Sequence, residues 1–153
     1  MVYCTTPEWQ LLQPLISVCF LKKPGLYHYL SMAKSNYREY LRGDIVRPKK
    51  YFYVLRPILA CKWILEKSTP PPMAFCTLTE EYLPAELTPE VNRLLDLKKR
   101  TSEIADGPRI DALNEFINRS LIEMEEAILH LPHEEPADWE ALNQTFYDLL
   151  NTN

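Results

Sequence analysis

Apolar residues recur every three or four positions in several long segments of the chain, a pattern typical of amphipathic helices. The longest of these segments covers residues 108–131, and its periodic positions are Ile110, Leu113, Ile117, Leu121, Met124, Ile128 and Leu131. No segment shows sustained alternation of β-branched apolar and polar residues, and the chain contains only three glycines, so a sheet is hard to build. The sequence therefore predicts an all-α fold, in which residues 1–153 form a single-domain bundle of six to seven helices.

Proline, threonine and glycine residues mark the expected ends of these helices. The expected helices cover residues 7–20, 24–42, 48–67, 78–83, 88–102, 108–131 and 138–150. Gly43 is expected to end the second helix in a left-handed conformation. The third helix is apolar on nearly all sides from Tyr51 to Leu65, which predicts a central position in the bundle. Pro57 lies inside this helix and is expected to kink it.

Length and composition exclude several classes of protein. No apolar run reaches the roughly 18 residues needed to cross a bilayer, and residues 1–10 lack the features of a secretory signal, so a cytoplasmic location is expected. The four cysteines form no Cys-x-x-Cys pair, which favours reduced thiols over a zinc or redox site. Pro132 separates His130 from His133 and no third ligand is near in sequence, so we expect a surface turn and no metal site.

Charge is distributed unevenly along the chain. Between Lys22 and Lys62 there are ten Lys or Arg and two acidic residues, a net charge of +8. The remainder has seven Lys or Arg and nineteen acidic residues, a net charge of −12. This asymmetry suggests a local anion-binding site on a protein that otherwise repels polyanions.

The start of the third expected helix offers residues for such a site. Lys49, Tyr53 and Arg56 are spaced so that their side chains share one helix face, and Lys50 is adjacent. Cations and a phenol close to a helix N-terminus are suited to binding phosphate. The alternative is structural: the stems of these cations cover a buried helix while their charged ends reach solvent.

A second set of cations lies on the preceding helix. The set consists of Lys34, Arg38 and Arg42, each four residues apart. Because a short connection follows, the second and third helices should pack as neighbours, and the seven cations between residues 34 and 56 would then face a common groove. Tyr40 and Tyr53 could stack on bases there, whereas Tyr37 and Tyr51 are expected to fill the core.

Motifs for catalysis are missing from the sequence. It contains no Asp-x-Asp, no Gly-Ser dipeptide, no Walker loop and no Gly-x-Gly-x-x-Gly, and no grouping of Ser, His and Asp suggests a nucleophile. Metal-dependent phosphoryl transfer needs clustered carboxylates to hold Mg²⁺. We therefore expect a binding function, with no catalytic and no metal-binding residues in this chain.

Five segments carry a resemblance to a known family. They are HYLSMAKSNYREYLRGDIVRPKKYFYVLRPILACKWI (28–64), PPMAF (71–75), EVNRLLDLKKR (90–100), GPRIDALNEFI (107–117) and DWEAL (138–142). In these segments the chain resembles the C-terminal half of predicted nucleotidyltransferases of the DNA polymerase β superfamily. The closest group is the RlaP-like family, whose name refers to bacterial RNA repair operons.

The resemblance implies an enzyme with two parts. An N-terminal α/β catalytic domain carries Gly-Ser and Asp-x-Asp motifs, and a C-terminal helical part helps to hold the substrate. The chain matches only the helical part, so a catalytic domain in cis or in trans is an expected partner, and NTP and Mg²⁺ are expected for the full enzyme. The positions that match the family pattern are Asn36, Tyr37, Lys49, Lys50, Tyr53, Arg56, Gly107, Pro108 and Arg109. The candidate substrate- and phosphate-binding residues are therefore Lys49, Lys50, Tyr53, Arg56, Arg38, Arg42, Asn36 and Arg109.

The sequence leaves three hypotheses open. In the first, the chain is the helical substrate-binding part of a nucleotidyltransferase; alone, it is inactive and binds NTP weakly or not at all. In the second, it binds RNA or another single-stranded nucleic acid by itself, in the groove between the second and third helices. In the third, its basic face docks an acidic partner such as the catalytic domain. Apart from these hypotheses, an apolar patch exposed without that domain would allow a homodimer.

Overall fold

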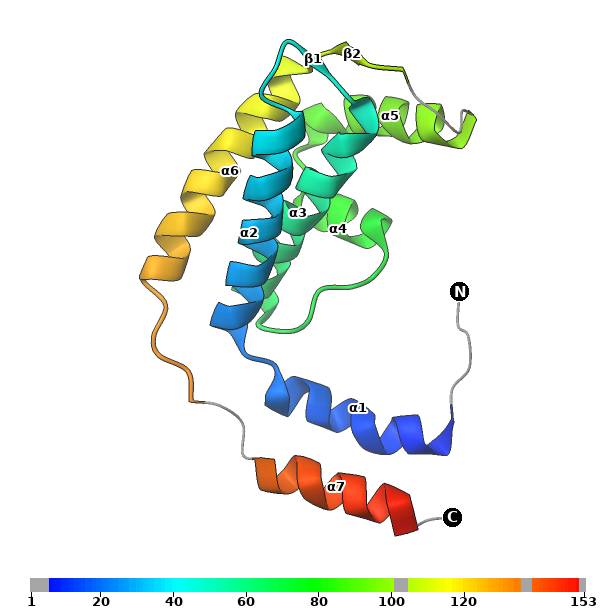
Figure 1. Cartoon of the computed structure of the whole chain (residues 1–153), viewed down its shortest axis with the longest axis vertical. Helices are drawn as coiled ribbons and strands as arrows, with labels where there is room; N and C mark the ends of the chain where they lie inside the picture. The colour runs from blue at the N-terminus through cyan, green and yellow to red at the C-terminus, as the bar shows by residue number, and fades with distance from the viewer. Residues whose placement is uncertain (1–5, 101–104, 136–138, 152–153) are drawn as a thin grey trace.

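The computed structural model describes residues 6–100, 105–135 and 139–151 and confirms the all-α prediction (Figure 1). Its helices are α1 (Pro7–Cys19), α2 (Lys22–Tyr40), α3 (Tyr51–Lys67), α4 (Phe75–Tyr82), α5 (Thr88–Arg100), α6 (Asp111–Leu129) and α7 (Trp139–Asn151). Two 3₁₀ helices, η1 (Pro48–Lys50) and η2 (Ala85–Leu87), precede α3 and α5. Two short strands, β1 (Ile45–Val46) and β2 (Gly107–Pro108), form a small ribbon. Within the described ranges, no helix is long and apolar enough to span a membrane.

α3 lies at the centre of the bundle, as its apolar sequence predicts. Nine of its seventeen residues are buried, and it runs as one helix through Pro57. It packs against α2, α4 and α6 (Figure 1). The buried side chains that α2 and α6 contribute are Leu26, Leu30, Ala33, Tyr37, Leu113, Asn114, Phe116, Ile117, Ser120, Leu121, Met124 and Ile128. Removal of the apolar side chains in this list from water is the main stabilising contribution to the bundle.

A buried hydrogen-bond network joins the ends of α2, α3 and α6. The hydroxyl of Tyr51 donates to Oδ1 of Asn114 at 2.8 Å and accepts from the N–H of Ile110 at 2.8 Å. Nδ2 of Asn114 donates to the carbonyl of Leu41 at 2.8 Å. Burial raises the pKa of the Tyr51 hydroxyl, which therefore keeps its proton and remains a donor. The network thus pairs polar groups from three helix ends inside the core.

The connection after α2 differs from the prediction in two respects. Gly43 does not adopt a left-handed conformation; in the described ranges Ser68 is the residue with positive φ, at 55°. A Cβ atom at Gly43 would lie 3.3 Å from the carbonyl oxygen of Ile45, so glycine serves a close backbone approach there. The expected helix start at Pro108 is also wrong, because β2 pairs antiparallel with β1 and α6 begins only at Asp111.

α1 and α7 pack against each other beyond the lower end of the bundle (Figure 1). None of their described side chains is buried. Glu134, in the segment between α6 and α7, accepts hydrogen bonds from the N–H groups of Lys22 and Lys23 at 3.1 and 2.7 Å. Its carboxylate therefore caps the positive end of α2 and ties this segment to the bundle.

Candidate functional site

The start of α3 carries a group of cations and aromatic rings. Nζ of Lys50 lies 3.6 Å from the centroid of the Tyr40 ring and 5.0 Å from that of the Tyr53 ring. Both distances are within the range of cation–π attraction. Tyr40 comes from α2 and is half-buried, whereas Tyr53 comes from α3 and is 55% exposed. Lys50 is therefore oriented by two rings, and one of these rings is open to solvent.

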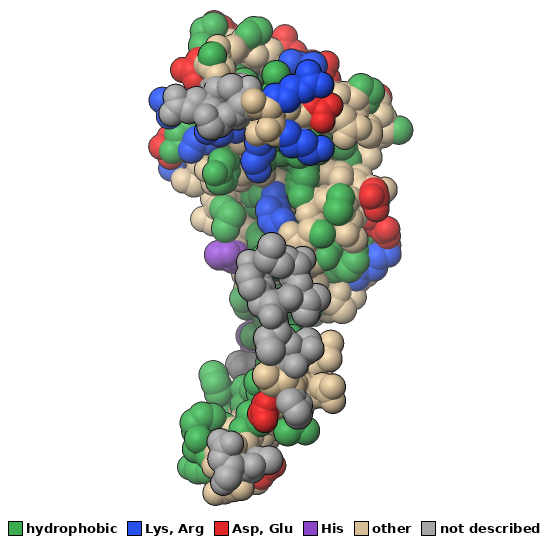
Figure 2. Space-filling model, turned by 90° about the vertical axis from the view of Figure 1, so that its right-hand side faces the viewer, with side chains coloured by type: hydrophobic (Ala, Val, Ile, Leu, Met, Phe, Trp, Pro, Cys, Tyr) green, Lys and Arg blue, Asp and Glu red, His purple; other side chains and the backbone are tan. Residues whose placement is uncertain are grey.

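Side chains from two further segments extend this group. Nζ of Lys98 in α5 lies 5.4 Å from the centroid of the Phe52 ring, which packs edge-to-face on Phe75. Arg56 donates to the carbonyl of Met73 at 2.6 Å, so its guanidinium is held beside the segment that leads into α4. We call this group of side chains the basic aromatic surface; it consists of Tyr40, Lys49, Lys50, Phe52, Tyr53, Arg56 and Lys98. Figure 2 shows Lys and Arg side chains gathered in the upper part of the molecule, which contains the start of α3.

Three cations of this surface, Lys50, Arg56 and Lys98, are oriented by groups that do not neutralise their charge. In the part of the chain that the structure describes, Lys50, Arg56 and Lys98 form no ion pair with an acidic side chain; their partners are aromatic rings and a backbone carbonyl. The local potential is therefore positive and favours anions. The sequence predicts that Lys49, Tyr53 and Arg56 share one helix face, with Lys50 adjacent. The structure places both lysines in η1 and the other two residues in the first two turns of α3.

Sequence reasoning missed Phe52 and Lys98. Phe52 lies in the segment that is apolar on nearly all sides, and Lys98 lies more than forty residues further along the chain. A signal for Lys98 was present, since residues 98–100 form a basic end of α5. The contact between α5 and the start of α3, which brings Lys98 to Phe52, could not be read from that signal.

The cations expected to share one groove are divided between two flanks of α2. Lys34 forms an ion pair with Glu125 of α6, and Arg38 lines a cavity between α2 and α6. Tyr40, which packs against Lys50, follows Arg38 by two residues and so lies about 200° around the helix. The seven cations therefore do not face the common groove expected from the sequence, and Arg42 is exposed beyond the end of α2.

Three other residues of the family pattern make contacts within the fold. Asn36 donates to the carbonyl of Met32 on its own helix at 2.8 Å, and Tyr37 is buried. Nε of Arg109 donates to Oδ1 of Asp111 at 2.8 Å, and this hydrogen bond raises the pKa of the guanidinium. These contacts lie within α2 and at the start of α6, and the assignment of Asn36 and Arg109 to substrate binding stays a prediction.

Nearly the whole chain matches one family model. The model is described as the RNA repair pathway DNA polymerase β family, RlaP, and it matches residues 1–148. The chain belongs to this family. The uncharacterized protein YcgL of Bacillus subtilis strain 168 is 41% identical over 142 residues, which are 92% of this chain and 54% of that protein. The chain thus spans about half the length of this relative. No solved structure matches the chain.

Among the residues that the structure describes in this RlaP family member, no group of three or more His, Cys, Asp or Glu side chains could hold a metal ion. Cys19, Cys61 and Cys76 are free thiols. Burial in α3 raises the pKa of Cys61 to about 12, so this thiol remains protonated and unreactive at neutral pH. The basic aromatic surface, in contrast, is suited to binding an anion or an aromatic group.

Proposed function

We propose that the basic aromatic surface of this RlaP family member holds the nucleotide substrate of a nucleotidyl transfer. The observation that carries the proposal is the position of Lys50 between two tyrosine rings, one of which is open to solvent. An exposed ring beside a cation without an acidic partner is suited to a base and its phosphates. The description of the family as DNA polymerase β-like supports nucleotide chemistry.

The proposal gives each part of the surface a separate task. Tyr53 stacks on the base, while Lys49, Lys50 and Arg56 neutralise the phosphates. In the transfer, a base outside this chain would take the proton of an acceptor hydroxyl. The hydroxyl oxygen would then bond to the α-phosphorus while the bond to the β-phosphate breaks and pyrophosphate leaves. Cations near the leaving group stabilise the negative charge that grows on it. Carboxylates of another domain or chain would hold Mg²⁺, which would supply Lewis-acid chemistry at the acceptor and the phosphate.

An NMR titration of the ¹⁵N-labelled chain with ATP tests the proposed site. We expect weak binding, with amide shifts concentrated between residues 49 and 56. K50E should weaken binding about fivefold, because it removes a charged contact worth about 1 kcal/mol. R119E is the matched control, since Arg119 is an exposed residue of α6 whose nearest acidic partner is Glu123 on the same helix at 3.9 Å. This control should change the affinity less than about twofold.

Tripolyphosphate separates stacking from charge in the same titration. Y53A should weaken ATP binding about fivefold or more and tripolyphosphate binding less than about twofold, because only ATP has a base to stack and Tyr40 still orients Lys50. Two results would contradict the proposal. One is a set of ATP-induced shifts centred away from α3, and the other is substantial Mg²⁺-dependent nucleotidyl transfer by the purified chain alone.

A second candidate function is the binding of single-stranded RNA across the same surface. It is favoured by the presence of several rings, Tyr40, Tyr53 and Phe52, each with a cation next to it, since successive bases stack on such rings. Filter binding of a labelled oligonucleotide at increasing salt distinguishes the two functions. Retention that falls steeply with salt and with K50E supports RNA binding, and no retention at low ionic strength rejects it.

A further inference from the structure

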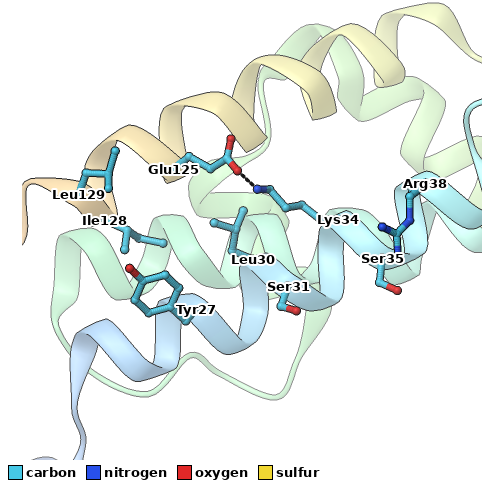
Figure 3. Close-up of a pocket in the computed structure, with 9 residues that line it drawn as sticks. All are labelled: Tyr27, Leu30, Ser31, Lys34, Ser35, Arg38, Glu125, Ile128 and Leu129. Atoms are coloured by element: carbon cyan, nitrogen blue, oxygen red, sulfur yellow. Dashed lines mark ion pairs between the residues drawn. The ribbon is translucent and has the colours of Figure 1, made fainter.

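A second concave surface lies on the opposite flank of α2 from Tyr40 and Lys50. Figure 3 shows this groove, which α2 and α6 line together. Its volume is about 690 Å³. This volume lies within the range of roughly 300–1,000 Å³ that is usual for small-molecule sites. The groove has an apolar end, an ion pair in the middle and a polar end, and each part restricts what it can bind.

The polar end presents one positive charge without a counter-ion. Arg38 is exposed and forms no hydrogen bond or ion pair with any residue that the structure describes. Figure 3 shows its guanidinium on the same side of α2 as the hydroxyl of Ser35. The nearby Lys34 is different, because Glu125 neutralises it across the groove (Figure 3). A guanidinium beside a hydroxyl binds carboxylate or phosphate through several hydrogen bonds at once.

The apolar end begins about two turns of α2 away from Arg38. Tyr27 and Leu129 form its rim and are 53% and 75% exposed, while Leu30 and Ile128 form its floor and are buried. Eight residues separate Leu30 from Arg38, which corresponds to about 12 Å along the helix axis. Side chains on a helix lean towards its N-terminus, so the guanidinium reaches back and shortens this separation to about 10 Å.

We infer that the α2–α6 groove binds an elongated organic anion. Its carboxylate or phosphate head is held by Arg38 and Ser35, and its apolar chain or ring lies between Tyr27, Leu129 and the floor of the groove. Head and apolar group are about 10 Å apart. Glu125 excludes a second negative charge from the middle of the ligand, although its pairing with Lys34 reduces that repulsion. The inference does not rest on the proposed nucleotide site, which lies on the other flank of α2.

Octanoate and octyl phosphate have a head and a chain of suitable length and serve as probes in an NMR titration of the ¹⁵N-labelled chain. We expect saturable shifts at amides 27–38 and 125–129, where the lining residues lie. Acetate has the head without the chain, and octanamide has the chain without the charge, so each should bind at least about fivefold more weakly than octanoate. The tighter of the two octyl probes identifies the head group as carboxylate or phosphate.

Two substitutions test the position of the anionic head. R38Q should weaken binding of the tighter octyl probe about fivefold or more. R42Q is the matched control, because Arg42 belongs to the same stripe of cations and does not line the groove. It should change binding less than about twofold. Arg38 has no partner in the described fold, so R38Q is expected to give the wild-type spectrum in the absence of probe.

Three results would overturn the inference. The first is an equal loss of affinity in R38Q and R42Q, because it would reduce the effect to net charge. The second is a set of shifts on α1 and α7, which would mean that the chain of the probe binds their exposed apolar residues. The third is no saturable shift with either octyl probe.

Discussion

α1 and α3 are alike in sequence and opposite in environment. Both are apolar over most of their surface, yet nine residues of α3 are buried and none of the described side chains of α1 is. α7 also has a marked apolar stripe and no buried residue. In Figure 2, hydrophobic side chains cover much of the lower part of the molecule, where α1 and α7 lie. A periodic apolar face thus predicts a helix and the side to be covered, but it does not identify what covers it.

The bundle and the α1–α7 pair also differ in how far apart in sequence their hydrogen-bonded residues lie. In the bundle, Asn114 bonds to Tyr51 and to the carbonyl of Leu41, residues 63 and 73 positions away. In α1 and α7, side-chain bonds such as those from Ser17 to Pro14 and from Thr145 to Ala141 stay within one helix turn. Buried bonds between distant segments are lost on unfolding at full cost, whereas exposed local bonds exchange with water. Most of the folding free energy should therefore reside in the bundle.

One substitution made in both regions should give the largest contrast. Leu59 in α3 is 0% exposed and Leu150 in α7 is 58% exposed. L59A should lower the free energy of unfolding by about 3 kcal/mol, because it loses apolar burial and leaves a cavity. L150A should lower it by less than about 0.5 kcal/mol. Urea denaturation followed by circular dichroism measures both, and comparable losses would show that a second chain covers α7 in solution.

The buried network gives the next largest expected effect. N114A should lower the free energy of unfolding by about 2 to 3 kcal/mol, because the carbonyl of Leu41 and the hydroxyl of Tyr51 lose their partner. N118A, one turn further along the exposed side of α6, is the control and should cost less than about 0.5 kcal/mol. A double-mutant cycle with Y51F should give a coupling of about 1 kcal/mol or more. Additive losses would mean that the network does not form in solution.

The helices themselves could be predicted because apolar spacing and helix-end residues act locally. The central position of α3 followed from its apolar surface, and helix starts near Pro7 and Thr88 followed from residues suited to a first turn. The network could have been suspected, since Asn114 occupies a position of the buried face between Ile110 and Ile117. Its partners could not be named, because pairing between residues more than sixty positions apart depends on how the helices are packed.

The candidate site could be predicted only in part for the same reason. Helical spacing predicts Lys49, Tyr53 and Arg56 on one face beside Lys50, because all four belong to one short segment. The separation of Arg38 from Lys50 depends on α6 packing against one flank of α2 and on Lys50 packing against the other. Residue type predicts a left-handed cap at Gly43, whereas in the structure glycine is favoured there by the close carbonyl of Ile45. Properties of one segment are thus readable from sequence, and properties of two segments in contact are not.

The smallest expected effect is a pH dependence of stability that arises in the bundle. Burial raises the pKa of Cys61 from 9.0 to about 12 in the folded chain. Above pH 9 the unfolded chain releases this proton and the folded chain keeps it, so the free energy of unfolding falls as pH rises, by about 1 kcal/mol at pH 10. C61A and C61S remove the titrating group and should both flatten this slope, although their absolute stabilities differ. Denaturation is measured between pH 8 and pH 10, a range below most of the titration of the Tyr51 hydroxyl. Burial also raises the pKa of that hydroxyl, so its titration would likewise lower the free energy of unfolding as pH rises. An unchanged slope in both variants would mean that the thiol of Cys61 is solvated, and α3 would then be less well covered than the structure shows.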